Sequence, residues 1–174
     1  MRFQVLAVIA AAALIAGCET APEQNAAASG AGGSAPAVQS QQTAQKMGPT
    51  AGSREDFVVN VGDRVFFDFD KFDLKPDAQS TLKKQAAWLQ KYPNVAVTVE
   101  GHADERGTRE YNLALGERRA NAVKDYLSAL GVAKTRVKTI SYGKERPVAL
   151  GHDEAAWAQN RRAVTTLTSG VPGS

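Results

Sequence analysis

The chain of 174 residues has few of the side chains from which metal sites and covalent catalysis are built. It contains one cysteine and two histidines, so an intramolecular disulfide is excluded. The histidines, His102 and His152, lie in separate segments. No helix can therefore present two histidines four residues apart, as the helical zinc-protease motif requires. We expect no enzyme activity, no metal and no cofactor.

The sequence also lacks a concentration of charge of either sign. The formal net charge is +3, and the 22% of charged residues alternate between acids and bases along the chain. Nucleic-acid binding proteins carry clustered Lys and Arg, so we expect no nucleic-acid partner. With 43% hydrophobic residues, the length and composition fit one domain with a real core.

The chain has one clearly apolar run near its N-terminus, and that run is too short to remain as a membrane span. Arg2 precedes it, it extends from Val5 to Ile15, and it leads into the sequence LIAGC. This pattern resembles a bacterial lipobox, which implies cleavage before Cys18, diacylglycerol on its thiol and a third acyl chain on the new N-terminus. The alternative is an ordinary secretory signal followed by an incidental cysteine. Glu19 follows Cys18, which by analogy with the lipoprotein sorting rule favours the outer membrane.

The composition divides the chain into four parts. Residues 1–17 are interpreted as the lipoprotein signal peptide and residues 18–55, rich in Ala, Gly, Ser, Gln and Pro, as a flexible lipidated tether. Residues 56–168 are predicted to form the folded domain, and residues 169–174 a disordered tail. Such a tether allows the domain to reach well beyond the membrane surface.

Within the domain, β-rich and helical patterns alternate. Strands alternating with helices of this length predict βαβ units, with helices packed on a sheet. The expected strands are 63–70, 95–102, 136–143 and 161–168, and the expected helices are 75–92, 109–131 and 153–160.

The helix expected over 109–131 separates two adjacent arginines. At 100° per residue, the apolar stripe of Val123, Leu127 and Leu130 continues toward the N-terminus through Arg119. Asn112 and Gly116 lie on the same side, whereas Arg118 points roughly opposite. Arg and Asn cannot be buried there without partners, because an unpaired buried polar group is costly.

The segment GHADERGT, residues 101–108, leads into this helix from the preceding strand and places Asp104 near Arg119. An aspartate and an arginine held close together can bind a zwitterion, because the carboxylate accepts an ammonium and the guanidinium a carboxylate. A structural salt bridge between Asp104 and Arg119 is the alternative.

Several segments together resemble a known family. They are VFFDFDKFDL, VTVEGHADERGTREYNLALGERRANAVKDYL and SYGKERPVALGHDEAAWAQNRRAV, with the lipobox. They resemble the peptidoglycan-associated lipoproteins, whose globular part is an OmpA-like domain, and the likeness covers about residues 63–167. The resemblance implies an α+β fold, an OmpA-like βαβαβ-type sandwich in which helices pack on one four-stranded mixed sheet.

The resemblance also implies a function. The family's domain binds the stem peptide of peptidoglycan non-covalently at its diaminopimelate residue, without catalysis. By position, Asp104 would accept the ammonium, Arg119 would hold the carboxylate, and the rest of the pocket would be Phe69, Asp70, Thr108, Asn112 and Leu115. The family further implies a lipid anchor in the outer membrane, the periplasmic β-propeller partner TolB, and work within the Tol-Pal system in envelope integrity and cell division.

Two other functions remain open from the residues alone. A metal-dependent hydrolase acting on the cell wall could use His102, Asp104 and Glu105 with the group at 152–154, although the ligand spacing argues against it. We expect His102 to be a hydrogen-bonded structural histidine instead. A protein that only binds a partner protein would not need an inward-facing Asp–Arg pair.

Overall fold

The computed structural model describes residues 48–172. The signal peptide, Cys18 and nearly all of the expected tether lie outside the described residues. The strands are β1 (Arg64–Phe66), β2 (Ala96–His102), β3 (Val137–Gly143) and β4 (Arg162–Ser169). The main helices are α2 (Pro76–Lys91), α3 (Arg109–Ala129) and α4 (Glu154–Asn160), with a 3-10 turn at Lys134–Arg136. A helical turn, α1 (Arg54–Asp56), continues into a π-helical segment, Phe57–Val61.

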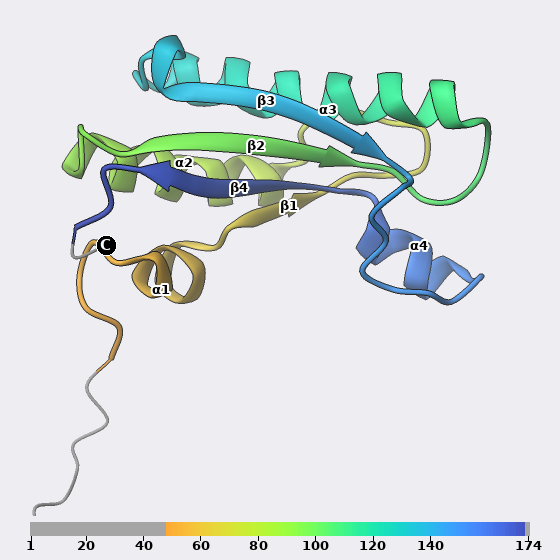
Figure 1. Ribbon diagram of the computed structural model, residues 1–174, viewed down its shortest axis with the longest axis horizontal. Helices are drawn as coiled ribbons and strands as arrows, with labels where there is room; N and C mark the ends of the chain where they lie inside the picture. The colour runs from red at the N-terminus through yellow and green to blue at the C-terminus, as the bar shows by residue number, and fades with distance from the viewer. Residues whose placement is uncertain (1–47, 173–174) are drawn as a thin grey trace, which may run out of the picture. The chain divides into compact units, whose positions relative to one another are not determined.

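The four strands form one mixed sheet in the order β1-β4-β2-β3. β2 and β3 are parallel and are joined through α3, while β4 is antiparallel to both of its neighbours, β1 and β2. Figure 1 shows the last strand inserted between β1 and β2. The predicted class, helices packed on a four-stranded mixed sheet, is confirmed.

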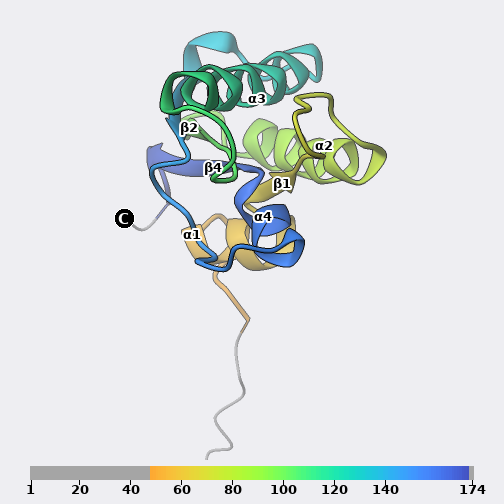
Figure 2. The same cartoon turned by 90° about the vertical axis from the view of Figure 1, so that its right-hand side faces the viewer.

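The core lies between the sheet and the two long helices. Figure 2 shows α2 and α3 side by side on the same side of the sheet. The fully buried apolar residues of the helices and of the central strands meet there; they include Leu82, Leu89, Val97, Val99, Val123, Leu127 and Leu167. The alternating apolar positions of β2 and the apolar stripe of α3 thus face each other, as their sequence periods predict.

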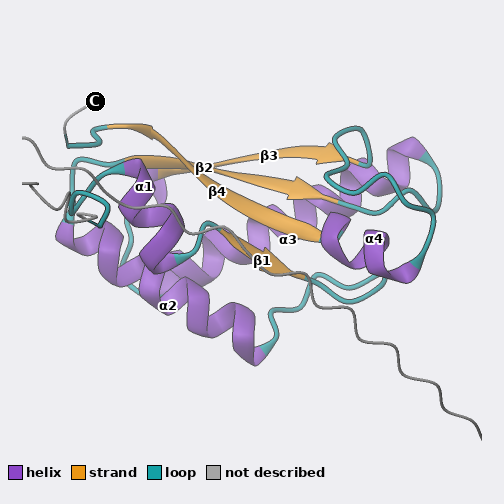
Figure 3. Ribbon diagram, turned by 90° about the horizontal axis from the view of Figure 1, so that it is seen from below, coloured by secondary structure: helices purple, strands orange, loops and turns teal. Residues whose placement is uncertain are grey.

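The beginning of the domain differs from the prediction in two ways. The segment from α1 to Val61, which the sequence analysis did not anticipate, packs at one end of the sheet (Figure 3). Its Phe57 is fully buried, with its ring 5.0 Å from that of Trp88, and Arg54 donates to the carbonyl of Leu167 at 2.9 Å. The strand expected over 63–70 was predicted too long, because β1 ends at Phe66 and Asp70 has a positive φ of 58°.

Two glycines let α3 approach the sheet closely. A Cβ placed on Gly101 of β2 would lie 1.8 Å from the carbonyl oxygen of Gly116 in α3. A Cβ on Gly116 would lie 2.3 Å from the hydroxyl of Ser141 in β3. Backbone therefore packs on backbone where the helix crosses β2 and β3, and this contact sets the depth of the helix on the sheet.

Adding one methyl group at this crossing should destabilise the domain. We expect Gly101→Ala to lower the free energy of unfolding by about 3 kcal/mol, because overpacking a filled contact is costly and the obstacle here is backbone. Urea denaturation measures the change. Gly48→Ala is the control, since nothing lies within 4 Å of its added Cβ, and we expect a change below about 0.5 kcal/mol. Equal urea midpoints for Gly101→Ala and the unchanged protein would contradict the close-approach argument.

Candidate functional site

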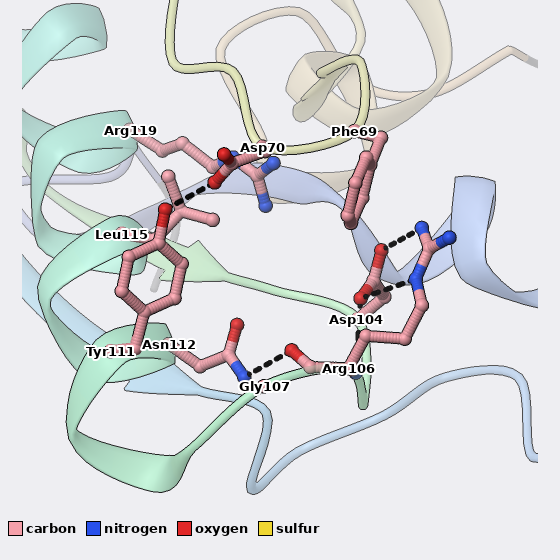
Figure 4. Close-up of a pocket in the computed structure, with 9 residues that line it drawn as sticks. All are labelled: Phe69, Asp70, Asp104, Arg106, Gly107, Tyr111, Asn112, Leu115 and Arg119. Carbon is pink, nitrogen blue, oxygen red and sulfur yellow. Dashed lines mark hydrogen bonds and ion pairs between the residues drawn. The ribbon is translucent and has the colours of Figure 1, made fainter.

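A pocket opens where the loops after β1 and β2 meet the first turns of α3 (Figure 4). Nine residues line it: Phe69, Asp70, Asp104, Arg106, Gly107, Tyr111, Asn112, Leu115 and Arg119. Its volume is about 170 Å³, below the roughly 300–1,000 Å³ of pockets that hold drug-sized ligands. The pocket therefore suits the end of one amino acid rather than a whole peptide.

The loop after β1 supplies one wall. Asp70 has a left-handed backbone conformation, which aspartate adopts more readily than most residues. Its carboxylate accepts a short hydrogen bond from the hydroxyl of Tyr111 in the first turn of α3, and this bond raises the pKa of Tyr111. The ring of Phe69 is 56% exposed and stands at the mouth of the pocket (Figure 4). Left-handed backbone conformations such as that of Asp70 are often found at functional sites.

Asp104 is the buried acid of the pocket, with 4% of its surface exposed. Its carboxylate accepts from Nη2 of Arg106 at 2.7 Å, from Nε of Arg106 at 3.2 Å and from Nη1 of Arg161 at 3.4 Å. Burial alone would raise the pKa of the Asp104 carboxyl, but the hydrogen bonds from Arg106 and Arg161 hold it below its usual value. Asp104 is therefore ionised at neutral pH.

Arg119 is fully buried, whereas Arg118 is exposed, as the helical phase predicted. The alternative of a direct salt bridge between Arg119 and Asp104 is wrong, although both residues line the pocket as the zwitterion hypothesis expected. The guanidinium instead donates to three backbone carbonyls: Lys71 at 2.8 Å, His102 at 2.8 Å and Asp68 at 3.1 Å. Burial lowers the pKa of Arg119 to about 10, so the side chain keeps its charge at neutral pH. Asp104 does not accept a hydrogen bond from Arg119, because its oxygens already accept from Arg106 and Arg161.

The first turns of α3 supply the remaining wall. Asn112 is buried and donates to the carbonyls of Arg106 and Thr108, which holds the preceding loop against the helix. Leu115 is buried one turn further on. Thr108 caps the helix by accepting from the backbone N–H of Tyr111 at 3.2 Å, and it is not among the nine lining residues.

The structure thus gathers six of the seven predicted site residues around one pocket, and their binding role stays a prediction. Sequence reasoning missed Arg106, Gly107 and Tyr111, which line it as well. Arg106 lies in the GHADERGT segment, two residues after Asp104, and Tyr111 falls in the first helical turn one residue before Asn112, so both lie within two residues of predicted positions. Their roles depend on contacts with residues far away in the sequence, which periodicity does not reveal.

His102 is buried, as expected of a structural histidine, but the expected hydrogen bond is wrong. Within residues 48–172, neither ring nitrogen has a hydrogen-bond partner, and the nearest carboxylate oxygen is that of Glu100, 3.8 Å from Nε2. Burial, together with the positive charges of Arg162 and Arg146, lowers the pKa of His102 to about 4. In the described part of the chain, no three His, Cys, Asp or Glu side chains are grouped as a metal site would need.

Comparison with known proteins places the chain in a family. The profile of the OmpA family matches residues 66–161. The peptidoglycan-associated lipoprotein of Agrobacterium fabrum is 65% identical over 118 residues, which cover 68% of this chain and 67% of that protein. The protein of the same name from Mesorhizobium japonicum is 52% identical over 171 residues, covering 96% of this chain and 93% of that protein.

Comparison with solved structures supports the same assignment. The peptidoglycan-associated lipoprotein of Burkholderia pseudomallei matches with a TM-score of 0.60 and 49% identity, over 61% of this chain and 90% of that one. The C-terminal domain of Helicobacter pylori MotB, with a TM-score of 0.58 and 23% identity over 62% of this chain and 84% of that one, shares the fold. An OmpA-like domain is thus the class that the fold and the pocket define. The chain belongs to the OmpA family and, within it, to the peptidoglycan-associated lipoproteins.

The buried His102 should make stability depend on pH. Its folded-state pKa of about 4 lies below the unfolded value near 6.5. The unfolded chain therefore gains a proton in this window before the folded chain does, and stability falls as pH drops from 7 to 4. This group alone accounts for up to about 3 kcal/mol.

His102→Gln should remove most of this slope, measured by urea denaturation at several pH values between 4 and 7. The charged groups nearest the ring, Glu100, Arg146 and Arg162, stay in place in this variant and serve as an internal control. An identical pH slope in both proteins would show that His102 is not the responsible group.

Proposed function

We propose that this protein is a lipid-anchored outer-membrane protein that binds peptidoglycan non-covalently, through the diaminopimelate of the stem peptide. The observation that carries the proposal is the small pocket in which a buried carboxylate, Asp104, and a buried guanidinium, Arg119, both reach the surface of the cavity. The name of two relatives, peptidoglycan-associated lipoprotein, supports the cell-wall ligand, since they are 65% and 52% identical to this chain.

The free end of diaminopimelate carries an ammonium and a carboxylate on one carbon. Asp104 would accept the ammonium, because its carboxylate is ionised and lines the pocket. Arg119 uses three of its five N–H donors on backbone carbonyls, which leaves two for a ligand carboxylate. Charge-assisted hydrogen bonds of this kind are about twice as strong as neutral ones.

The other predicted residues have supporting roles in this proposal. Asp70 and Phe69 would form the opposite wall, and Leu115 would contact the ligand's methylene groups. Asn112 and Thr108 would act by holding the loop and the helix start in place. Asp70, Asn112 and Thr108 are already held by hydrogen bonds within the domain, so much of the pocket wall is formed before a ligand arrives.

The wider role rests on family membership and the N-terminal pattern. We propose that Cys18 carries the lipid anchor, that the predicted tether ends before Arg54, which belongs to the folded helix α1, and that the domain joins the outer membrane to the cell wall in the Tol-Pal system, with TolB as partner, in envelope integrity and cell division. The OmpA family is not an enzyme family, and the proposed ligand is bound rather than transformed. Residues 48–172 include no helix with the length and hydrophobicity needed to span a bilayer.

Neutralising Asp104 should weaken binding to the cell wall. We expect Asp104→Asn to bind isolated sacculi about ten- to a hundredfold more weakly, because a charge-assisted hydrogen bond to the ligand ammonium is lost. The measurement is a pull-down with purified domain and free diaminopimelate as competitor, with folding checked by circular dichroism.

Two controls accompany this variant. Glu105→Gln makes the same chemical change in the adjacent residue, whose carboxylate pairs with His152 rather than lining the pocket. Arg118→Ala removes an exposed arginine and should likewise retain binding, since exposed pairs contribute under about 1 kcal/mol. Wild-type binding by a folded Asp104→Asn would overturn the assignment. Arg119→Ala is a poor test, because it would strip three buried carbonyls of their donor.

The lipid anchor has its own test. We expect mass spectrometry of the native protein from membranes to show an N-terminal peptide that begins at Cys18 and carries acyl chains, since more than one chain is needed for stable anchoring. Cys18→Ser should leave the protein out of the outer-membrane fraction while the purified domain still binds sacculi. An unmodified thiol, or cleavage at another residue, would refute the anchor without affecting the ligand assignment.

A further inference from the structure

Arg106 already fills the position that a ligand ammonium needs. Its guanidinium makes two hydrogen bonds to Asp104, at 2.7 and 3.2 Å (Figure 4), and its backbone N–H and Arg161 donate to the same carboxylate, so both oxygens are occupied; Arg106 and Asp104 both line the pocket. In the free domain the buried acid is therefore neutralised from within the chain. A ligand ammonium can reach Asp104 only by taking over hydrogen-bonding positions that Arg106 now holds.

Of the two arginines on Asp104, only Arg106 is free to move. The Arg161 side chain is 6% exposed and also donates from Nε to the carbonyl of Phe67 at 3.0 Å and from Nη2 to Glu154. The Arg106 side chain is 30% exposed and, within residues 48–172, donates to no backbone carbonyl. Arg161 thus holds Asp104 in place, whereas Arg106 can be displaced toward solvent.

In its present position the Arg106 guanidinium also has partners besides Asp104. Its central carbon lies 3.9 Å from the centroid of the Phe69 ring and 4.1 Å from that of the Trp157 ring, so the group stacks against two aromatic faces. A second acid, Glu154, lies 3.8 Å from Nη2 and is largely exposed. Arg106 can leave Asp104 and still keep its cation–π contacts and a carboxylate partner at the mouth of the pocket.

We propose that Arg106 is a placeholder for the ligand ammonium and becomes, once displaced, a second ligand for the adjacent carboxylate. This inference rests on the proposed function and adds a specificity-determining residue to it. The exchange is balanced in charge: Asp104 trades one cation for another, and the released guanidinium gains the ligand's anion. Arg119 cannot move in this way, because three backbone carbonyls hold it.

The exchange favours ligands that carry both charges on one carbon. An ammonium alone, as at the end of a lysine side chain, would displace Arg106 and give its guanidinium no anion in return. A carboxylate alone would meet a guanidinium still bound to Asp104. A diaminopimelate end satisfies both groups at once, so Arg106 makes the pocket discriminate between stem peptides with diaminopimelate and those with lysine.

The test compares two tripeptides, L-alanyl-γ-D-glutamyl-meso-diaminopimelate and the same peptide with L-lysine as its third residue. Calorimetry or fluorescence titration gives the dissociation constants for the wild-type domain and for Arg106→Gln. We expect the preference for diaminopimelate to fall at least about tenfold in Arg106→Gln, because a charge-assisted hydrogen bond to the carboxylate is lost. The lysine peptide should bind this variant as tightly as the wild type or more tightly, since it no longer has to displace Arg106.

Arg109→Gln is the matched control. Arg109 is 73% exposed, pairs with Glu145 and lies outside the pocket, so this variant should keep the wild-type preference. A purely structural role of Arg106 predicts that both peptides lose affinity in parallel, and an unchanged preference in Arg106→Gln would overturn the inference. If the wild-type domain bound neither peptide, the proposed function itself would fail, and the inference with it.

A second measurement needs no variant. In the wild-type protein, the Nε–H resonance of Arg106 should shift when the diaminopimelate peptide saturates the domain, because this donor leaves Asp104. The Nε–H resonance of Arg161 should shift much less, since its bond to the Phe67 carbonyl is kept. An unmoved Arg106 resonance at saturation would show that the guanidinium stays on Asp104 and would overturn the inference.

Discussion

The guanidinium of Arg119 joins three parts of the chain that lie far apart in the sequence: α3, the loop after β1 and the end of β2. Its nitrogens bind the carbonyls of Asp68 and Lys71, in the loop after β1, and of His102, at the end of β2. One side chain from α3 thereby satisfies backbone groups that would otherwise be buried without partners, which is costly. The two loops that form the pocket are held at fixed positions relative to the helix, so the shape of the pocket depends on this one buried cation.

The use of Arg119 as a structural cation explains the charges in the pocket. The donors of Arg119 are directed to backbone carbonyls, and the hydrogen bonds to Asp104 come from Arg106 and Arg161 instead. The three arginines therefore have different partners. Arg119 binds backbone carbonyls, whereas Arg161, whose side chain is 6% exposed, and Arg106, whose side chain is 30% exposed, both bind Asp104. Such a pocket combines a fixed charge pattern with one exposed, movable group. The close crossing of Gly101 and Gly116 supports this arrangement by bringing α3 near enough for Arg119 to reach the end of β2.

Patterns within a single element were the reliable part of the prediction. The helix and strand positions from residue 75 onward agree with the structure to within two residues at each end, and the phase of α3 correctly buried Arg119 and exposed Arg118. The errors arose where the decisive contact lies far away in the sequence. The alternative of a direct Arg119–Asp104 salt bridge was wrong because both residues have other partners. The helical segment before β1 was missed because its burial comes from Phe57 packing on Trp88.

By itself, the sequence determined the alternation of strands and helices and the inward face of α3, and it brought Asp104 and Arg119 to one end of the predicted sheet. These follow from local periodicity and from the few residues at loop ends, which depend only on neighbours along the chain. The tertiary structure alone decided which arginine meets which acid or carbonyl, that Thr108 caps the helix instead of lining the pocket, and that Phe69 and Trp157 enclose Arg106. For each of these contacts the sequence offers several groups of similar chemistry. Only the positions of the folded backbone determine which of them lies close enough to make the contact.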